Sequence, residues 1–177
     1  QMSKTYNYKT FGVDDIEYQT PKLIRGGSFL ARVASEDRVF FQTPKLTTTT
    51  PITVDTKGCY LEFAITEDER EFAEFLHQLD SHNMTHTHTN SSDWFGSEFS
   101  YDVVQDFYIP SVQHRVQEDE TSSYVKFRLP LHKRVPNINV YDERRELVDW
   151  KRVTEGTGVV AILELKGLKF LQNKLVC

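Results

Sequence analysis

The sequence has few of the residues that mark several large protein classes. Only two of its 177 residues are cysteines, Cys59 and Cys177, which is too few for a disulfide framework and favours a reducing, intracellular compartment. No run of about 18 apolar residues occurs, so we expect no transmembrane helix. Hydrophobic residues make up 38% of the chain and charged residues 27%. This composition is ordinary for a globular protein with a real core. Because no transmembrane helix is expected, we also expect no membrane partner.

Sequence motifs of catalysis are also missing. The chain has no glycine-rich phosphate loop, no serine elbow, no HExxH and no paired-cysteine motif. Carboxylate runs at residues 67–71 and 118–120 could hold a metal, but the first suits a helix first turn and the second a loop. His82, His86 and His88 could also ligate a metal. Their segment is rich in threonine and asparagine, which favours a flexible polar loop. We expect no enzyme, no cofactor and no metal site.

Charge is distributed unevenly along the chain. The net charge of −5 by itself argues against a nucleic-acid partner. Residues 1–54 carry 7 Lys/Arg and 5 Asp/Glu, residues 55–123 carry 3 and 15, and residues 124–177 carry 11 and 6. The basic ends could form one basic face, with the acidic third turned away from a bound strand. The acidic third is equally compatible with a solvated helical region.

Alternating apolar residues predict a mainly antiparallel β protein. We expect about eight to ten short strands and two helices in the middle third, which is an α+β fold. The alternation is clearest at residues 59–65 and 124–129. We expect a single domain over residues 1–177, an OB-like barrel or a sandwich, with a helical insertion over residues 66–110. The apolar pattern stops at Cys177, so we expect the native chain to be truncated there.

The middle third carries the helix signals. Thr66 and Glu69 have capping-box spacing and predict a helix over residues 67–80. An apolar stripe with helical spacing follows and should pack against the sheet: Phe72, Phe75, Leu76 and Leu79. The polar residues 81–92 predict a mobile loop. A second helix is expected from Asp93 or Ser97 to about Phe107.

The pentapeptide Gln-Thr-Pro-Lys-Leu occurs twice, at residues 19–23 and 42–46. Each copy could simply be a strand end that proline stops. The second copy follows Phe40-Phe41 and precedes four threonines. It therefore combines rings that could stack on bases with a lysine that could bind phosphate, as nucleic-acid-binding strands do.

Aromatic and basic residues are interleaved elsewhere too. On a strand over residues 124–129, Tyr124, Lys126 and Arg128 would share one face, while Val125 and Phe127 would face the core. The alternative is that the rings belong to the core and the cations only keep the protein soluble. If the pattern marks a nucleic-acid surface, the candidate residues are Phe41, Lys45, Tyr124, Lys126, Arg128, Lys133, Arg134, Trp150, Lys151 and Arg152.

Four segments in a fixed order give the chain a resemblance to single-stranded DNA-binding proteins of large eukaryotic DNA viruses. The segments are FFQTPKL at residues 40–46, EFAEFLHQLD at 71–80, FYIPSV at 107–112 and GVVAILELKGLKF at 158–170. The resemblance implies an OB-like barrel with helical additions, in which FQTPKL runs from a strand into a loop. That family often has a tryptophan where this chain has Leu168, so no stacking role carries over to this position.

We therefore expect a non-enzymatic protein that binds single-stranded DNA, or RNA, during viral DNA replication or recombination. The resemblance implies viral replication proteins as partners and a location in the host nucleus or a cytoplasmic viral factory. A homo-oligomer is compatible with these expectations, but the sequence does not determine the oligomeric state. The alternative is a viral structural or protein-interaction module that does not bind nucleic acid.

Overall fold

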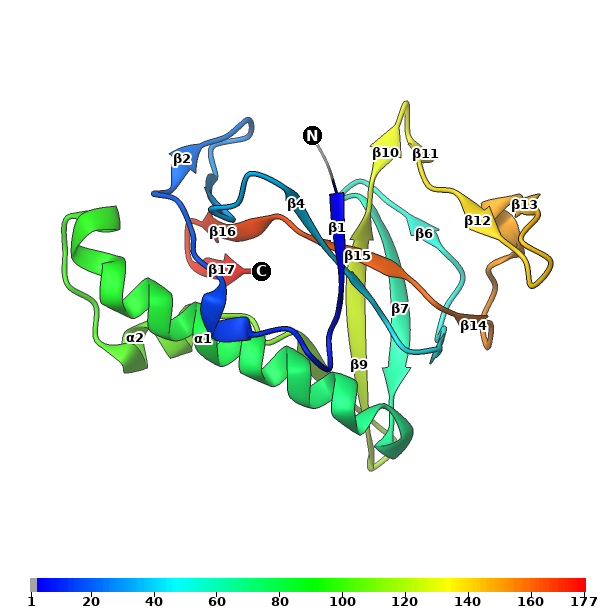
Figure 1. Ribbon diagram of the computed structural model, residues 1–177. Coiled ribbons are helices and arrows are strands. Elements are labelled where there is room, and N and C mark those ends of the chain that lie inside the picture. The colour runs from blue at the N-terminus through cyan, green and yellow to red at the C-terminus, as the bar shows by residue number, and fades with distance from the viewer. Residues whose placement is uncertain (1–2) are drawn as a thin grey trace. The chain divides into compact units, whose positions relative to one another are not determined.

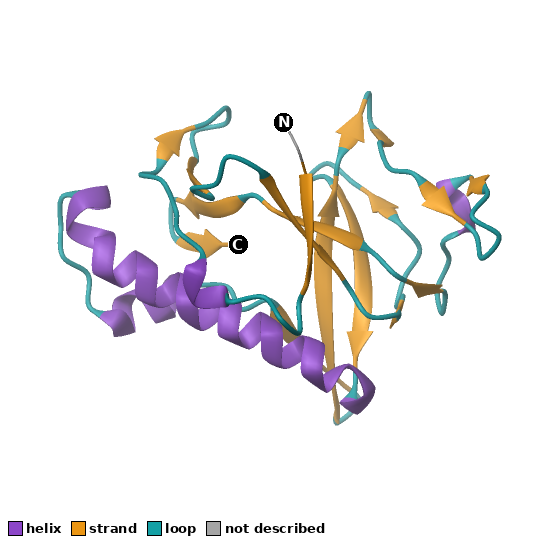
Figure 2. Cartoon of the chain, viewed as in Figure 1, coloured by secondary structure: helices purple, strands orange, loops and turns teal. Residues whose placement is uncertain are grey.

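The computed structural model describes residues 3–177 and shows an α+β protein with mostly antiparallel strands and two α-helices (Figures 1 and 2). The α+β prediction is confirmed. Within these residues the strands form separate sheets of two to four strands, and no closed barrel is found. No helix in the same range is both long and apolar enough to cross a membrane.

The chain divides into two compact units. The first unit takes the described residues up to Thr43 together with Glu71–Ser111 and Ala161–Cys177. The second unit takes Pro44–Arg70 and Val112–Val160. Each unit is therefore assembled from segments that are distant in the sequence.

The first unit contains both helices and two sheets. In one sheet β4 pairs with β1 in parallel and with β15 in antiparallel fashion, and the other sheet has the antiparallel order β17-β16-β3-β2. Helix α1 belongs here from Glu71 onward. The elements are β1 (Ser3–Asn7), the 3-10 turn η1 (Val13–Asp15), β2 (Lys22–Leu23), β3 (Phe29–Arg32), β4 (Arg38–Gln42), α1 (Arg70–Phe95), α2 (Tyr101–Phe107), β15 (Ile162–Leu165), β16 (Gly167–Leu171) and β17 (Lys174–Val176).

The second unit is built around an antiparallel sheet of order β6-β7-β9-β8, with three short two-stranded ladders beside it: β5-β14, β10-β11 and β12-β13. Strands β6 and β7 pair in antiparallel fashion as a hairpin. The elements are β5 (Leu46–Thr47), β6 (Thr53–Val54), β7 (Cys59–Ile65), η2 (Glu67–Glu69), β8 (Val112–Gln117), β9 (Glu120–Leu129), β10 (Leu131–His132), β11 (Val135–Pro136), β12 (Val140–Tyr141), β13 (Leu147–Val148), η3 (Trp150–Arg152) and β14 (Gly158–Val159).

The helical segment starts where the sequence predicts. The Thr66 hydroxyl accepts a hydrogen bond from the Asp68 N–H, and the Glu69 carboxylate accepts one from the Thr66 N–H at 2.7 Å, which confirms the capping box. The predicted stripe Phe72, Phe75, Leu76 and Leu79 is buried. The ring of Phe75 lies 5.2 Å from that of Phe41 on β4, so the stripe packs on the sheet as predicted.

The loop predicted at residues 81–92 is wrong, because α1 continues through this segment to Phe95. Threonine, asparagine, serine and histidine are weak helix formers, which is why the sequence suggested a loop. Tertiary hydrogen bonds hold the segment helical instead. The buried Asn83 side chain accepts a hydrogen bond from the Tyr18 hydroxyl at 2.5 Å and donates one to the Tyr108 hydroxyl at 3.1 Å. The second helix is also shorter than expected and begins only after its Ser100 cap.

The three histidines lie on this continuation of α1. His82 Nε2 is 2.6 Å from the carbonyl oxygen of Ile16, and His88 Nδ1 is 2.7 Å from that of Phe99. The His86 ring lies 5.4 Å from Tyr18. Residues 3–177 contain no group of three or more His, Cys, Asp or Glu that could hold a metal ion. Two of the histidines therefore fasten α1 to neighbouring segments.

We predict that acid weakens the fold partly through His86. Burial and the neighbouring His82 lower the pKa of His86, although Glu17 opposes the shift. Below the ordinary histidine pKa of 6.5 the unfolded chain thus binds a proton that the folded chain still excludes. Stability falls as the pH drops from 6.5 through the folded pKa. Between about pH 7.5 and about pH 5.5 the melting temperature of the wild type should fall further than that of His86→Gln, and equal falls would contradict this role.

Candidate nucleic-acid interface

One face of the sheet β6-β7-β9-β8 gathers charged and aromatic side chains. Residues that pair across an antiparallel sheet point to the same face, and successive residues alternate between faces. The inner face holds the buried Leu61, Phe63, Val112 and Val125. The opposite face, called the polar face below, carries Tyr60, Glu62, Arg115, Tyr124, Lys126 and Arg128.

Two cation–π pairs lie on the polar face. The Arg115 guanidinium carbon is 4.3 Å from the centre of the Tyr124 ring. The Lys126 Nζ is 4.6 Å from the centre of the Tyr60 ring. Each pair joins residues of neighbouring strands, so the sheet fixes where the rings and charges lie.

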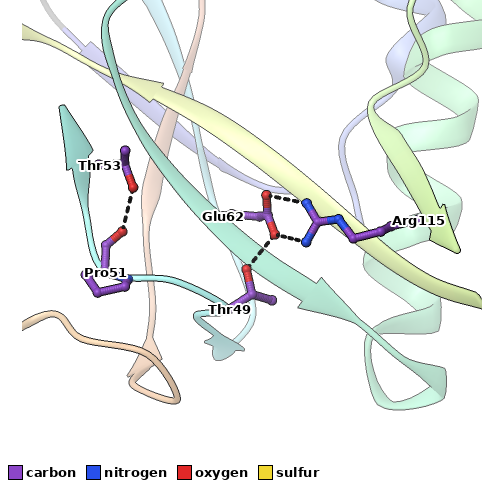
Figure 3. A network of polar contacts seen from close by, with 5 residues as sticks. All are labelled: Thr49, Pro51, Thr53, Glu62 and Arg115. Carbon is purple, nitrogen blue, oxygen red and sulfur yellow. Dashed lines mark hydrogen bonds and ion pairs between the residues drawn. The ribbon is translucent and has the colours of Figure 1, made fainter. Parts of the chain in front are cut away.

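The carboxylate of Glu62 lies beside the Arg115 guanidinium on this face (Figure 3). Glu62 is only 7% exposed, and its two oxygens accept hydrogen bonds from Arg115 Nη1 at 3.1 Å and Nη2 at 3.0 Å. The Thr49 hydroxyl donates to the same carboxylate at 2.6 Å. Burial alone would raise the pKa of Glu62, but the hydrogen bonds from Arg115 and Thr49 and the charges of Arg115 and Lys126 together hold it below its usual value. The carboxylate therefore stays ionised at neutral pH and fixes the Arg115 guanidinium.

The predicted shared face of Tyr124, Lys126 and Arg128 is confirmed. Val125 is fully buried, and the Phe127 ring lies 6.1 Å from that of Phe63 on the inner side. Sequence reasoning missed Tyr60, Glu62 and Arg115. The alternation at residues 59–65 already showed which residues of β7 face outward, but nothing in the sequence indicated that β8 pairs with β9.

Phe41 does not belong to this surface. It lies on β4 in the first unit, is 3% exposed, and its ring packs against Phe11 at 4.8 Å and Phe75 at 5.2 Å. A base could stack on it only if this core opened. The doublet Phe40-Phe41 leaves the inward residue undecided, because neighbouring strand residues point to opposite faces. In the fold Phe41 points inward, while the centre of the Phe40 ring lies 4.9 Å from the guanidinium carbon of Arg38.

Strands β10 and β11 form a hairpin (Figure 1), and their register makes Lys133 and Arg134 the two residues of its turn. Both have left-handed backbone conformations, with φ of 50° and 66°. Two-residue hairpin turns of this kind favour Asn-Gly, and other residues carry strain of roughly 1 kcal/mol each. The turn thus holds two exposed cations close to the end of β9, since β10 begins two residues after β9 ends.

The other candidate residues are also on the second unit. The side chain of Lys45 passes so close to Gly158 on β14 that a Cβ there would collide with it. Trp150, Lys151 and Arg152 form η3, whose first residue follows the Asp149 cap. Trp150 is half-buried, while Lys151 and Arg152 are exposed. Except for Phe41, every residue predicted from the sequence therefore belongs to one unit.

The second unit is not basic as a whole. It carries 12 Lys/Arg and 13 Asp/Glu, and the first unit carries 9 and 13. The acidic third of the sequence also spans both units. Attraction for a polyanion must therefore come from the local placement of cations on the polar face and at the hairpin tip, rather than from net charge.

The chain belongs to a protein family described as a family of unknown function (DUF5871), which matches residues 54–176. The matched range contains β7, β8 and β9 and thus both cation–π pairs. No curated protein and no solved structure matches the chain.

Proposed function

We propose that the protein binds single-stranded nucleic acid, and single-stranded DNA above all, through the polar face of the second unit. The observation that supports this most is the pair of ring–cation contacts, Tyr60 with Lys126 and Tyr124 with Arg115, on one sheet face. Stacking on such groups contributes about 1–3 kcal/mol per base, and cations near the phosphates add salt-dependent affinity. The binding would tolerate any sequence and involve no catalysis.

We also propose that the chain is an OB-like fold with a helical insertion at residues 66–110. An antiparallel sheet that offers one polar face to a strand, with loops beside it, supports this comparison. The resemblance of segments 40–46, 71–80, 107–112 and 158–170 to viral single-stranded DNA-binding proteins supplies the proposed setting. In that setting the protein coats exposed strands during replication or recombination inside the host cell.

Removing cations from β9 should flatten the salt dependence of binding. Lys126 and Arg128 are both exposed on the polar face. For a labelled single strand of about 30 nucleotides, the double change to alanine should reduce the slope of log affinity against log salt by about 0.7 to 1.4. Fluorescence anisotropy at several salt concentrations measures this slope, with a duplex of equal length for comparison.

The exposed first-unit residues Lys22 and Arg25 provide the matched control. Their double change to alanine removes the same charge and should leave the slope unchanged. If the wild-type protein has no affinity for the single strand at low salt, the proposed function is wrong.

A protein-interaction role is the second candidate, and one hairpin favours it. Tyr141 on β12 and Leu147 on β13 are cross-strand partners and are 59% and 65% exposed. Large exposed apolar side chains of this kind are common at protein interfaces. This role would come first if two results were found together. The protein would self-associate in a way that is lost when Tyr141 and Leu147 are both changed to serine, and it would not bind single strands.

A further inference from the structure

The Arg115 guanidinium differs from the other cations of the polar face in how it is held. Two of its nitrogens donate hydrogen bonds to the Glu62 carboxylate, which approaches the edge of the guanidinium plane. The centre of the Tyr124 ring lies 4.3 Å from the central carbon of the guanidinium. The Arg115 side chain is nevertheless 38% exposed. The guanidinium is therefore a fixed flat surface that the solvent can reach.

Its charge is already balanced within the protein. The bidentate partner Glu62 is buried and fixed in turn by Thr49. Counterions leave a nucleic-acid strand where protein cations neutralise its phosphates, and an arginine whose charge and N–H groups are already taken by a carboxylate is poorly suited to do so. Lys126 is the contrasting case, because its ammonium lies over a neutral ring and its side chain is exposed.

We infer that Arg115 and Tyr124 together form a stacking site for one nucleobase, and that Arg115 is not a phosphate contact. The site rests on the proposed function and deepens it. Nucleobases stack on guanidinium planes as well as on aromatic rings. Because Glu62 fixes the plane before the strand arrives, little side-chain freedom is lost when a base stacks on it.

The test measures how the 177-residue chain binds two different single strands of about 30 nucleotides. One is fluorescein-labelled oligothymidylate, and the other is an abasic deoxyribose-phosphate strand of equal length and charge. Glu62→Gln/Arg115→Met removes the guanidinium plane and both charges of the pair, so it should lower the affinity for oligothymidylate about fivefold to 150-fold, while the affinity for the abasic strand and the salt slope stay unchanged. The matched variant Lys126→Met should lower the affinity for both strands by the same factor and flatten the salt slope by about 0.7.

The two single variants unbalance the charged pair and check the role of each charge. Arg115→Met leaves the Glu62 carboxylate without its partner, so it should also weaken binding of the abasic strand. Glu62→Gln alone frees the arginine charge and should steepen the slope by about 0.7.

The possible failures can be told apart. Wild-type protein that binds neither strand overturns the proposed function. Wild-type protein that binds both strands equally well overturns the stacking site alone. The stacking site is also wrong if the double variant lowers the affinity for both strands by the same factor and flattens the salt slope, because Arg115 would then be a phosphate contact.

Discussion

Replacing Phe75 with alanine is expected to lower the free energy of unfolding by about 3–5 kcal/mol. The Phe75 side chain is 6% exposed and lies among the rings of Phe41 at 5.2 Å, Tyr8 at 5.8 Å and Phe72 at 6.3 Å. These rings come from α1, from β4 and from the segment after β1. The change therefore removes buried apolar surface and leaves a cavity where the helix meets the sheet of the first unit.

Thermal unfolding followed by circular dichroism measures the effect. For a chain of this length the melting temperature should fall by about 6–20 °C. Phe29→Ala is the matched control, because Phe29 lies in the same unit on β3 but is 46% exposed. It should lower stability by about 1 kcal/mol or less. An unchanged melting temperature for Phe75→Ala would contradict the packing of α1.

Replacing Gly167 with alanine is expected to cost about 3 kcal/mol or more. Gly167 is the first residue of β16 and pairs with Arg32 of β3. Its φ of 145° is a backbone conformation that residues with a side chain rarely adopt. An added Cβ would also collide with the carbonyl oxygen of Ala31, a backbone atom that cannot rotate away. The two strands would have to separate, although they carry the buried Leu168 and Ala31.

Gly156→Ala separates backbone strain from this collision. Gly156 also has a left-handed conformation, with φ of 75°, but nothing lies within 4 Å of where its Cβ would be. Its replacement should cost only about 1 kcal/mol. Urea unfolding compares the two variants, and equal midpoints would show that the close approach of β16 and β3 does not matter.

The charged pair on the polar face shows why a site can escape sequence analysis. Glu62 and Arg115 are 53 residues apart. Arg115 lies on β8, which has no strong apolar alternation, and Glu62 occurs in an alternating strand where any outward polar residue would fit. Only the pairing of β7, β9 and β8 shows that these two side chains meet beside Tyr124.

Local sequence patterns alone determined the structure of short stretches of the chain and which of their residues share a face. The capping box at Thr66, the buried stripe from Phe72 to Leu79 and the common face of Tyr124, Lys126 and Arg128 all follow from residues within one or two turns or one strand. Tertiary structure decided the rest. It extended α1 to Phe95 by hydrogen-bonding buried polar side chains, turned Phe41 into the core, and fixed Arg115 against Glu62 and Tyr124. Each of these outcomes depends on partners distant in the sequence, and such contacts leave no periodic signal in the segment they stabilise.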